Sequence, residues 1–357
     1  MEDISELIEP KSSEWLEQNG KTVKVKVERI RDHREAGIIG GAWSFVALKS
    51  PTSYLIGSNL KGIKLIENRA EFFSSRLEKQ FLKDICYIKR SNFYVLSFQE
   101  KIYRKDVDNK PPYEFLDVSC GQRNGASFRY SSIHHRLVIV KDRANIAVVN
   151  TDRKRVENEI KRDNKECSNI IQDFRLIGKR ETGVVYLTFG GCLNLCFFSY
   201  DLKKICAQNY FQIELKKERN ELPLSLAVCE KKKYLLVELM ASNTFYTSRI
   251  VVFVIKSNLL VNEAVLDLHN QQIAYKMAFE FCRYVGKGRD LLWVGLSNEL
   301  HGVVYLYHYD SEEKVLRELE DARVKHNEFE PFKLVEVAGR LFYTGSKGML
   351  MCLTVEA

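Results

Sequence analysis

Short apolar segments recur along almost the whole chain, and this repeat sets the strongest limit on the fold. Seven of these segments are strongly apolar, and their first residues lie 39 to 57 positions apart. These first residues are Tyr54, Phe93, Leu137, Val184, Tyr234, Leu291 and Leu341. Each segment follows another short apolar stretch, and most precede a third and then a more polar fourth. Such a period indicates repeated small units of a few antiparallel strands.

The repeat predicts an all-β chain that folds as a single β-propeller, because propeller blades are small sheets of four antiparallel strands. The expected first strands cover residues 43–48, 85–88, 128–131, 174–177, 224–228, 277–281 and 332–337. We therefore expect seven four-stranded blades. The second repeat is the weakest, because residues 101–107 make a poor third strand. The alternative is an irregular all-β or α+β protein in two domains.

The repeats resemble those of the WD40 and WD40-like family over roughly residues 21–357. Two marks of typical repeats are absent, namely Gly-His before the first strand and Trp-Asp at the end of the third. Degenerate counterparts of the second mark end at Asp152, Asp201 and Asp310. The resemblance implies a propeller that acts as a rigid platform for partner proteins.

The two ends of the chain are expected to meet in one blade. The last repeat, residues 332–355, supplies only three strands. Residues 21–30 precede the first blade, and valine and lysine alternate there from position 23 to position 27. Alternation with a period of two is typical of a half-exposed strand. We predict that this segment is the outer strand of blade 7 and closes the ring, with its lysines discouraging edge-to-edge aggregation.

Residues 1–20 differ in charge from the rest of the chain. They hold six acids and one lysine, a net charge of −5, so the remaining residues carry +8 − (−5) = +13. We treat residues 1–20 as an acidic tail or a short helix, and residues 21–357 as the propeller. In the helix, Ser12 and Ser13 would cap residues 14–17. The tail should be attracted to a basic surface of the propeller, with Trp15 and Leu16 adding apolar burial.

The cysteines and the ends of the chain indicate an intracellular protein, either cytoplasmic or nuclear. There are nine cysteines at irregular spacing, an odd number, and the chain has no Asn-x-Ser/Thr sequon. Irregular cysteines among apolar neighbours are typical of a reducing compartment. No apolar run approaches the ~20 residues that span a bilayer. The N-terminus is acidic and lacks the basic and apolar regions of a signal peptide.

The motifs of common enzymes are missing, so we expect no catalytic residue, no cofactor and no metal. There is no P-loop, no G-x-G-x-x-G after a strand, no H-E-x-x-H and no G-x-S-x-G. Cys192 and Cys196 would lie ~13 Å apart along one strand, too far to share a zinc ion. His134-His135 reads as a turn, and the acids of residues 312–321 alternate with bases, as on a solvated surface.

In such a ring, the loops between strands two and three and the loops between blades emerge on one face. The candidate partner-binding residues on that face are Lys61, Lys141, Arg143, Arg249, His301 and Lys347. We predict a non-catalytic scaffold, monomeric on its own, that binds partner proteins or peptides through this face. The alternative is a propeller that binds nucleic acid or another polyanion through a basic face. Basic clusters lie at residues 29–34, 153–165, 203–204, 216–219 and 231–233.

Structural features distinguish these functions. A scaffold should show an apolar or aromatic patch on one face, and a polyanion binder should show a contiguous basic face. An enzyme should show acids or metal ligands that converge around the central channel. Trp43 and Trp293, in expected strands, should be buried between blades.

Overall fold

The computed structural model describes most of the strands of the chain and a few of its turns. The described residues are 9–18, 21–32, 44–47, 52–56, 62–66, 69–73, 82–88, 93–98, 101–106, 113–116, 128–131, 133–141, 145–160, 170–177, 183–198, 205–228, 234–244, 246–256, 259–268, 282–285, 291–298, 303–310, 313–318, 324–325, 331–337, 340–345 and 349–356. In these residues the strands form seven antiparallel sheets. No helix in this part of the chain is long and apolar enough to cross a membrane.

Three sheets come from the first half of the chain, and each contains four strands that follow one another in sequence. One consists of β3 (Ser44–Ala47), β4 (Thr52–Ile56), β5 (Gly62–Ile66) and β6 (Arg69–Phe73). The next consists of β7 (Leu82–Ile88), β8 (Phe93–Phe98), β9 (Lys101–Asp106) and β10 (Tyr113–Leu116). The third consists of β11 (Phe128–Ser131), β12 (Arg136–Lys141), β13 (Asn145–Asn150) and β14 (Arg155–Ile160).

Three further sheets follow in the second half. The first consists of β15 (Ile171–Ile177), β16 (Gly183–Thr188), β17 (Cys192–Phe198) and β18 (Ile205–Gln212). The second consists of β19 (Glu221–Val228), β20 (Tyr234–Ala241), β21 (Tyr246–Lys256) and β22 (Leu259–Asp267). The third consists of β23 (Cys282–Val285), β24 (Leu291–Asn298), β25 (Val303–Asp310) and β26 (Val315–Glu318), and the short β27 (Val324–Lys325) also pairs with β25.

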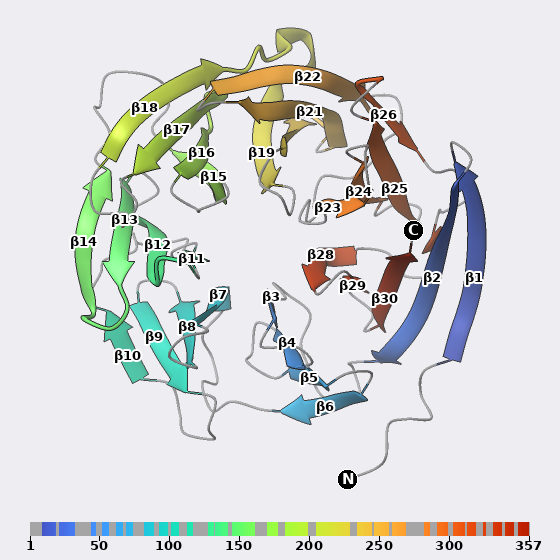
Figure 1. Cartoon of the computed structure of the whole chain (residues 1–357), viewed down its shortest axis with the longest axis horizontal. Helices are drawn as coiled ribbons and strands as arrows, with labels where there is room; N and C mark the ends of the chain where they lie inside the picture. The colour runs from blue at the N-terminus through green and yellow to red at the C-terminus, as the bar shows by residue number, and fades with distance from the viewer. Residues whose placement is uncertain are drawn as a thin grey trace.

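The remaining sheet joins the two ends of the chain. Its strand order is β1-β2-β30-β29-β28, where β1 is Glu9–Gln18, β2 is Lys21–Asp32, β28 is Pro331–Val337, β29 is Arg340–Gly345 and β30 is Met349–Glu356. Figure 1 shows the sheets standing around a common centre, with one end strand of each sheet innermost, β28 in this sheet, and the other near the rim, β1 in this sheet. Neighbouring innermost strands contact one another, as β15 and β19 do. This is an all-β, propeller-like arrangement.

The strands expected from the sequence are largely confirmed. All seven strongly apolar segments are second strands of sheets. Residues 101–106, expected to be a poor strand, form β9. The expected more polar fourth strands include β18, which begins at Ile205, and β22, which begins at Leu259. The expected strand at residues 277–281 lies outside the described part of the chain.

The segment before the first sheet corrects two expectations. The helix expected around Ser12 and Ser13 is wrong, because Glu9–Gln18 is a strand that pairs antiparallel with β2. The predicted strand at residues 21–30 is present and pairs with β30, but β1 lies beyond it, so β2 is not the outermost strand. Local capping residues favour a helix only weakly, and the pairing of residues 9–18 with β2 outweighs them.

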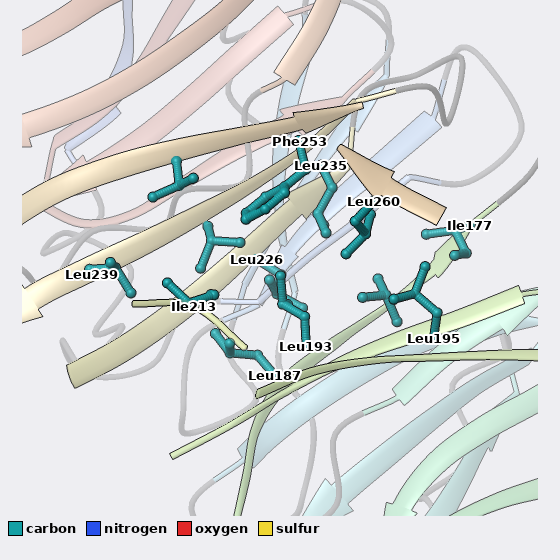
Figure 2. Packing of buried hydrophobic residues seen from close by; sticks show 13 residues of the cluster. Ile177, Leu187, Leu193, Leu195, Ile213, Leu226, Leu235, Leu239, Phe253 and Leu260 are labelled. Atoms are coloured by element: carbon teal, nitrogen blue, oxygen red, sulfur yellow. The ribbon is translucent and has the colours of Figure 1, made fainter. Parts of the chain in front are cut away.

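The core lies between the sheets, and β20 shows how it is built. Seven of its eight residues are buried, because both faces of the strand pack against neighbouring sheets. Leu235, Val237 and Leu239 share a cluster with Leu187, Leu193 and Leu195 of the preceding sheet (Figure 2). On the other face, Tyr234 and Leu236 share a cluster with Tyr307 and Tyr309 of the following sheet. Successive side chains of a strand point to opposite faces, so a continuous apolar run suits a strand buried on both sides.

Candidate interaction face

Several turns meet at one end of the β15–β18 and β19–β22 sheets. The amide of Phe189 donates to the carbonyl of Ile170 (2.9 Å), and the amide of Ile213 donates to the carbonyl of Gly191 (2.9 Å). The amide of Ser242 donates to the carbonyl of Asn220 (3.1 Å). We call this surface the loop face, which consists of Ile170 and residues 189–191, 213–220 and 242–244. It includes both kinds of loop that the sequence placed on one face.

Glycine is required at one position of the loop face. Gly191 turns the chain from β16 into β17 with φ of +81°, in the left-handed region that L side chains rarely adopt. A Cβ there would also lie 3.1 Å from Cδ1 of Leu215. The side chain of Gln212 donates to the carbonyl of Gly190 (3.0 Å). The turn is therefore packed directly against the connection between the two sheets.

A buried ion pair holds that connection on the β19–β22 sheet. Glu221, at the start of β19, is 4% exposed and accepts from the amide of Lys216 (2.8 Å) and from Nη2 of Arg249 (2.7 Å). The hydroxyl of Ser248 also donates to Glu221 (2.7 Å). Arg249 donates further to the carbonyl of Glu214. These bonds tie both ends of residues 214–221 to β21, so the loop has a fixed position.

The charge of Glu221 follows from these partners. Burial alone would raise the pKa of its carboxyl group. The hydrogen bonds from Arg249, Lys216 and Ser248, together with the positive charge of Arg249, outweigh burial and lower the pKa below its ordinary value. Glu221 is therefore ionised at neutral pH and keeps its ion pair.

Exposed bonds complete the same connection. Residues 217–219 form the short 3-10 helix η3 (Lys217–Arg219), and Asn220 ends it with φ of 46°. Nη1 of Arg219 donates to both carboxylate oxygens of Asp267 (2.9 and 2.8 Å). The side chain of Asn220 donates to Oδ1 of Asn243 (3.1 Å) and joins the connection to the next turn. Exposed ion pairs add only ~0–1 kcal/mol each. The buried ion pair of Glu221 and Arg249, called the clasp below, is therefore the main contact that holds the connection.

The loop face presents a small apolar centre beside polar residues. Ile170 is 39% exposed and Phe189 is 37% exposed, and their backbones are hydrogen-bonded to each other. Exposed polar side chains on the same face are Lys217, Glu218, Asn220, Asn243 and Thr244. An aromatic residue surrounded by polar groups is the usual composition of a protein-binding surface. The signs of charge are mixed, which does not favour a polyanion here.

A second buried acid lies in the same sheet but inside it. Glu238 of β20 is 0% exposed and accepts from the hydroxyls of Ser225 (2.7 Å) and Thr247 (2.8 Å). Burial raises the pKa of Glu238 to about 7, and the two hydroxyls offset only part of that rise. Because no cation is among these partners, Glu238 differs from Glu221 although both are buried.

An acid on the innermost strands links three sheets. The carboxylate of Asp173 on β15 accepts from the amide of Leu226 on β19 (2.9 Å). Nη2 of Arg129 on β11 lies 3.5 Å from its other oxygen, which also pairs with Arg175. Asp173 is thus engaged in contacts that hold neighbouring sheets together.

The residues that the sequence argued against as metal ligands or catalytic acids make other contacts. The thiol of Cys192 donates to Oε1 of Gln212 (2.7 Å), and burial raises the pKa of Cys196 to about 12. The hydroxyl of Tyr130 lies 3.2 Å from Nδ1 of His135. Glu313 pairs with Arg317. In the described part of the chain no three His, Cys, Asp or Glu residues come together as a metal site.

The opposite end of the β11–β14 sheet carries a basic turn, residues 152–155. Oδ1 of Asn150 accepts from the amides of Asp152 and Arg153 (3.0 Å each) and shapes the turn between β13 and β14. Arg153, Lys154 and Arg155 are exposed. Ile133, in the neighbouring turn between β11 and β12, is 44% exposed. The turn of residues 152–155 is therefore more basic than the loop face.

The predicted site residues fall in different places. Lys61, Arg143, His301 and Lys347 lie outside the described residues, and Lys141 ends β12 with only its backbone described. Arg249 is a correction, since it lies within β21 rather than in a loop, and its side chain is buried against Glu221. Trp43 lies outside the described residues, and of Trp293 only the backbone on β24 is described.

The sequence reasoning missed Ile170 and Phe189. The available signal was the run Thr-Phe-Gly-Gly after the second strand at residues 183–188, where an aromatic residue stands at the tip of a turn. Large apolar residues at such tips are candidates for partner contacts.

Comparison with known proteins gives a structural match and no sequence match. No family model matches the chain, and no curated protein matches it by sequence. The β-propeller domain of Cps50 (Swd1) from Myceliophteria thermophila is similar in structure, with a TM-score of 0.60. It is 12% identical to this chain, and the match covers 92% of this chain and 98% of that domain. The chain therefore has the β-propeller fold that its repeats predict.

Proposed function

We propose that this chain is a non-catalytic interaction scaffold that binds partner proteins or peptides through the loop face. Residues 21–357 form a propeller of seven blades, whose ring is closed by the pairing of β2 with β30. The exposed pair of Ile170 and Phe189 carries the proposal. An aromatic residue on a rigid support loses little conformational entropy on binding, which makes it an efficient anchor.

The clasp under the loop face supports the same function. Glu221 and Arg249 fix the connection in the absence of a partner. A binding surface that is already ordered avoids the cost of ordering on association. Three acids of the described sheets, Asp173, Glu221 and Glu238, are engaged in hydrogen bonds or ion pairs within the fold, as expected of a platform.

Cross-linking in the native cell tests the proposal. Lys217 on the loop face and Lys154 in the basic turn are both exposed lysines, so they react with the same amine-specific reagent. Affinity purification followed by cross-linking mass spectrometry should give partner cross-links at Lys217 and few at Lys154. Cross-links that concentrate at Lys154 would contradict a scaffold that uses the loop face. The same experiment identifies the partner and its intracellular compartment.

The basic turn supports a second candidate function, the binding of nucleic acid or another polyanion. Three consecutive cationic side chains, Arg153 to Arg155, are exposed there. Contacts with phosphates would make the affinity fall steeply with salt. RNA binding should then weaken in a variant with Arg153→Glu and Lys154→Glu. A variant with Lys217→Glu should bind RNA as the parent protein does. Salt-independent or unchanged binding would reject this candidate.

A further inference from the structure

In the sheet that joins the chain ends, a described strand lies beyond the fourth position. In the other sheets the outer strands β6, β10, β14, β18, β22 and β26 end the order, and β27 pairs with β25 beside that path. In this sheet β2 occupies the fourth position, and β1 covers its outer edge (Figure 1). The edge of β2 is thus a place where a fifth strand binds.

The two strands are complementary in charge. Residues 9–18 contain three acids and one lysine, a net charge of −2. Residues 21–32 contain five bases and two acids, a net charge of +3. In the register Glu9 lies directly opposite Arg29. Glu14 and Glu17 lie opposite Val25 and Thr22, so their attraction to β2 comes from its net charge and not from direct pairs. Cross-strand pairs of opposite charge stabilise a sheet and help to fix its register.

The strand β1 can leave without undoing the rest of the sheet. In the described residues β1 pairs with β2 alone, whereas β2 also pairs with β30 from Lys24 to Asp32. Gln18 lies opposite Lys21, and Asn19-Gly20 stands between them. Asn-Gly is the dipeptide most favoured in two-residue hairpin loops. The short link keeps β1 at a high effective concentration next to the edge.

We propose that the outer edge of β2 is a strand-binding site for an acidic, extended segment of a partner protein, and that β1 occupies it in the free protein. Such a segment would add to the sheet through backbone hydrogen bonds, the mode known as β-augmentation. An acid at the position of Glu9 would lie opposite Arg29, and further acids would be attracted by the net charge of +3 on β2. This site lies at the rim and does not depend on the loop face.

The test keeps the full chain and opens only the hairpin. A protease site is inserted between Asn19 and Gly20, the protein is folded and purified, and the loop is then cut. A fluorescent peptide of residues 9–18 should exchange onto the cut protein. The uncut protein should bind this peptide on the order of 10²-fold more weakly, because its own β1 competes within the molecule. A peptide with Glu9, Glu14 and Glu17 changed to lysine should bind the cut protein at least about tenfold more weakly.

A second variant covers the case in which the cut protein unfolds. The uncut protein with Glu14→Lys and Glu17→Lys weakens β1 in place, so it should take up the parent peptide better than the parent protein does. The proposal is wrong if neither protein binds the peptide, or if cut and uncut proteins bind it equally. It is also wrong if the charge-reversed peptide binds as well as the parent peptide. Dimer formation by the cut protein, without peptide uptake, would assign the edge to a second copy of the chain.

Discussion

The sheet of β19–β22 and the sheet that joins the chain ends are both antiparallel, but their strands come from different parts of the chain. The first is built from one continuous stretch, residues 221–267, and its strands follow one another through short connections. The second needs β2 from one end of the chain and β28–β30 from the other. A contact between chain ends costs more loop-closure entropy than a hairpin. The first sheet is therefore robust to changes elsewhere, whereas the second depends on the termini.

The two sheets also treat their outer edges differently. Of the described residues in β22, Leu259, Val261 and Val265 are 59%, 41% and 48% exposed, and no described strand pairs beyond it. The strand β2 is rich in lysine and is covered by β1. Charge alone protects an edge in many proteins. In this protein the charged edge, that of β2, is covered by another strand. This agrees with the proposal that the edge of β2 binds a strand.

The largest expected effect comes from removing the N-terminal contribution to the joining sheet. Deletion of residues 1–32 removes β1 and β2 and exposes β30. Loss of this pairing and of its apolar burial should cost several kcal/mol of unfolding free energy, at ~25 cal/mol per Å². Deletion of residues 1–18 removes only the fifth strand and should cost much less. Thermal unfolding checks both, and equal melting temperatures for both truncations and the full chain would reject ring closure by β2.

The next effect belongs to the β19–β22 sheet and its clasp. Arg249→Met leaves the carboxylate of Glu221 buried without its cation, so it should destabilise the protein by about 3–5 kcal/mol. The double change Glu221→Gln with Arg249→Met should recover part of this loss. Arg219→Met is the matched control, because its partner Asp267 is half-exposed, and it should cost only ~0–1 kcal/mol. Equal losses in Arg249→Met and Arg219→Met, measured by urea unfolding, would contradict the clasp.

Glu238→Gln should reveal a dependence on pH within the same sheet. The pKa of Glu238 is raised from 4.5 to about 7 in the folded state. Its stabilising contribution is therefore fully present below pH ~4.5 and is lost as the pH rises through about 7. Relative to the parent, Glu238→Gln should gain stability above pH 7, by up to about 3 kcal/mol at 1.36 kcal/mol per pKa unit. Urea unfolding at pH 5 and pH 8 measures this, and an identical difference at both values would contradict it.

The smallest effect is expected at the bare edge of β22. Leu259 is largely exposed, so Leu259→Lys should change the unfolding free energy by no more than ~0.5 kcal/mol. Leu260 is its buried neighbour, and Leu260→Lys should be strongly destabilising. Similar melting temperatures for the two variants would show that the faces of β22 are assigned incorrectly.

The sequence predicted the fold better than the site, for physical reasons. Burial on both faces leaves a continuous apolar run, as at Tyr234 to Val237, and such runs revealed all the second strands. The prediction of a helix around Ser12 was wrong because the segment pairs with β2. Local capping residues carry no information about such pairing. The Asn-Gly at residues 19–20 was the overlooked hairpin signal.

The site was harder to predict because the charge of a residue does not show whether its side chain is buried. Arg249 looked like a surface cation in the sequence, yet the acid that neutralises it, Glu221, is 28 residues away. The apolar pair of Ile170 and Phe189 arises only when β15 and β16 pair, since the backbone bond between them joins the ends of these two strands. No composition or spacing rule brings these residues together before the sheet exists.

Matched variants at the two ends of the propeller test directly whether partners bind through the loop face. Phe189 on the loop face and Ile133 on the opposite turn are similarly exposed apolar residues, at 37% and 44%. Each is changed to aspartate, the folded state is verified by thermal unfolding, and the recovery of cross-linked partners is quantified by mass spectrometry. Phe189→Asp should lose the partners, and Ile133→Asp should retain them. Retention by Phe189→Asp together with loss by Ile133→Asp would contradict the loop face as the binding surface.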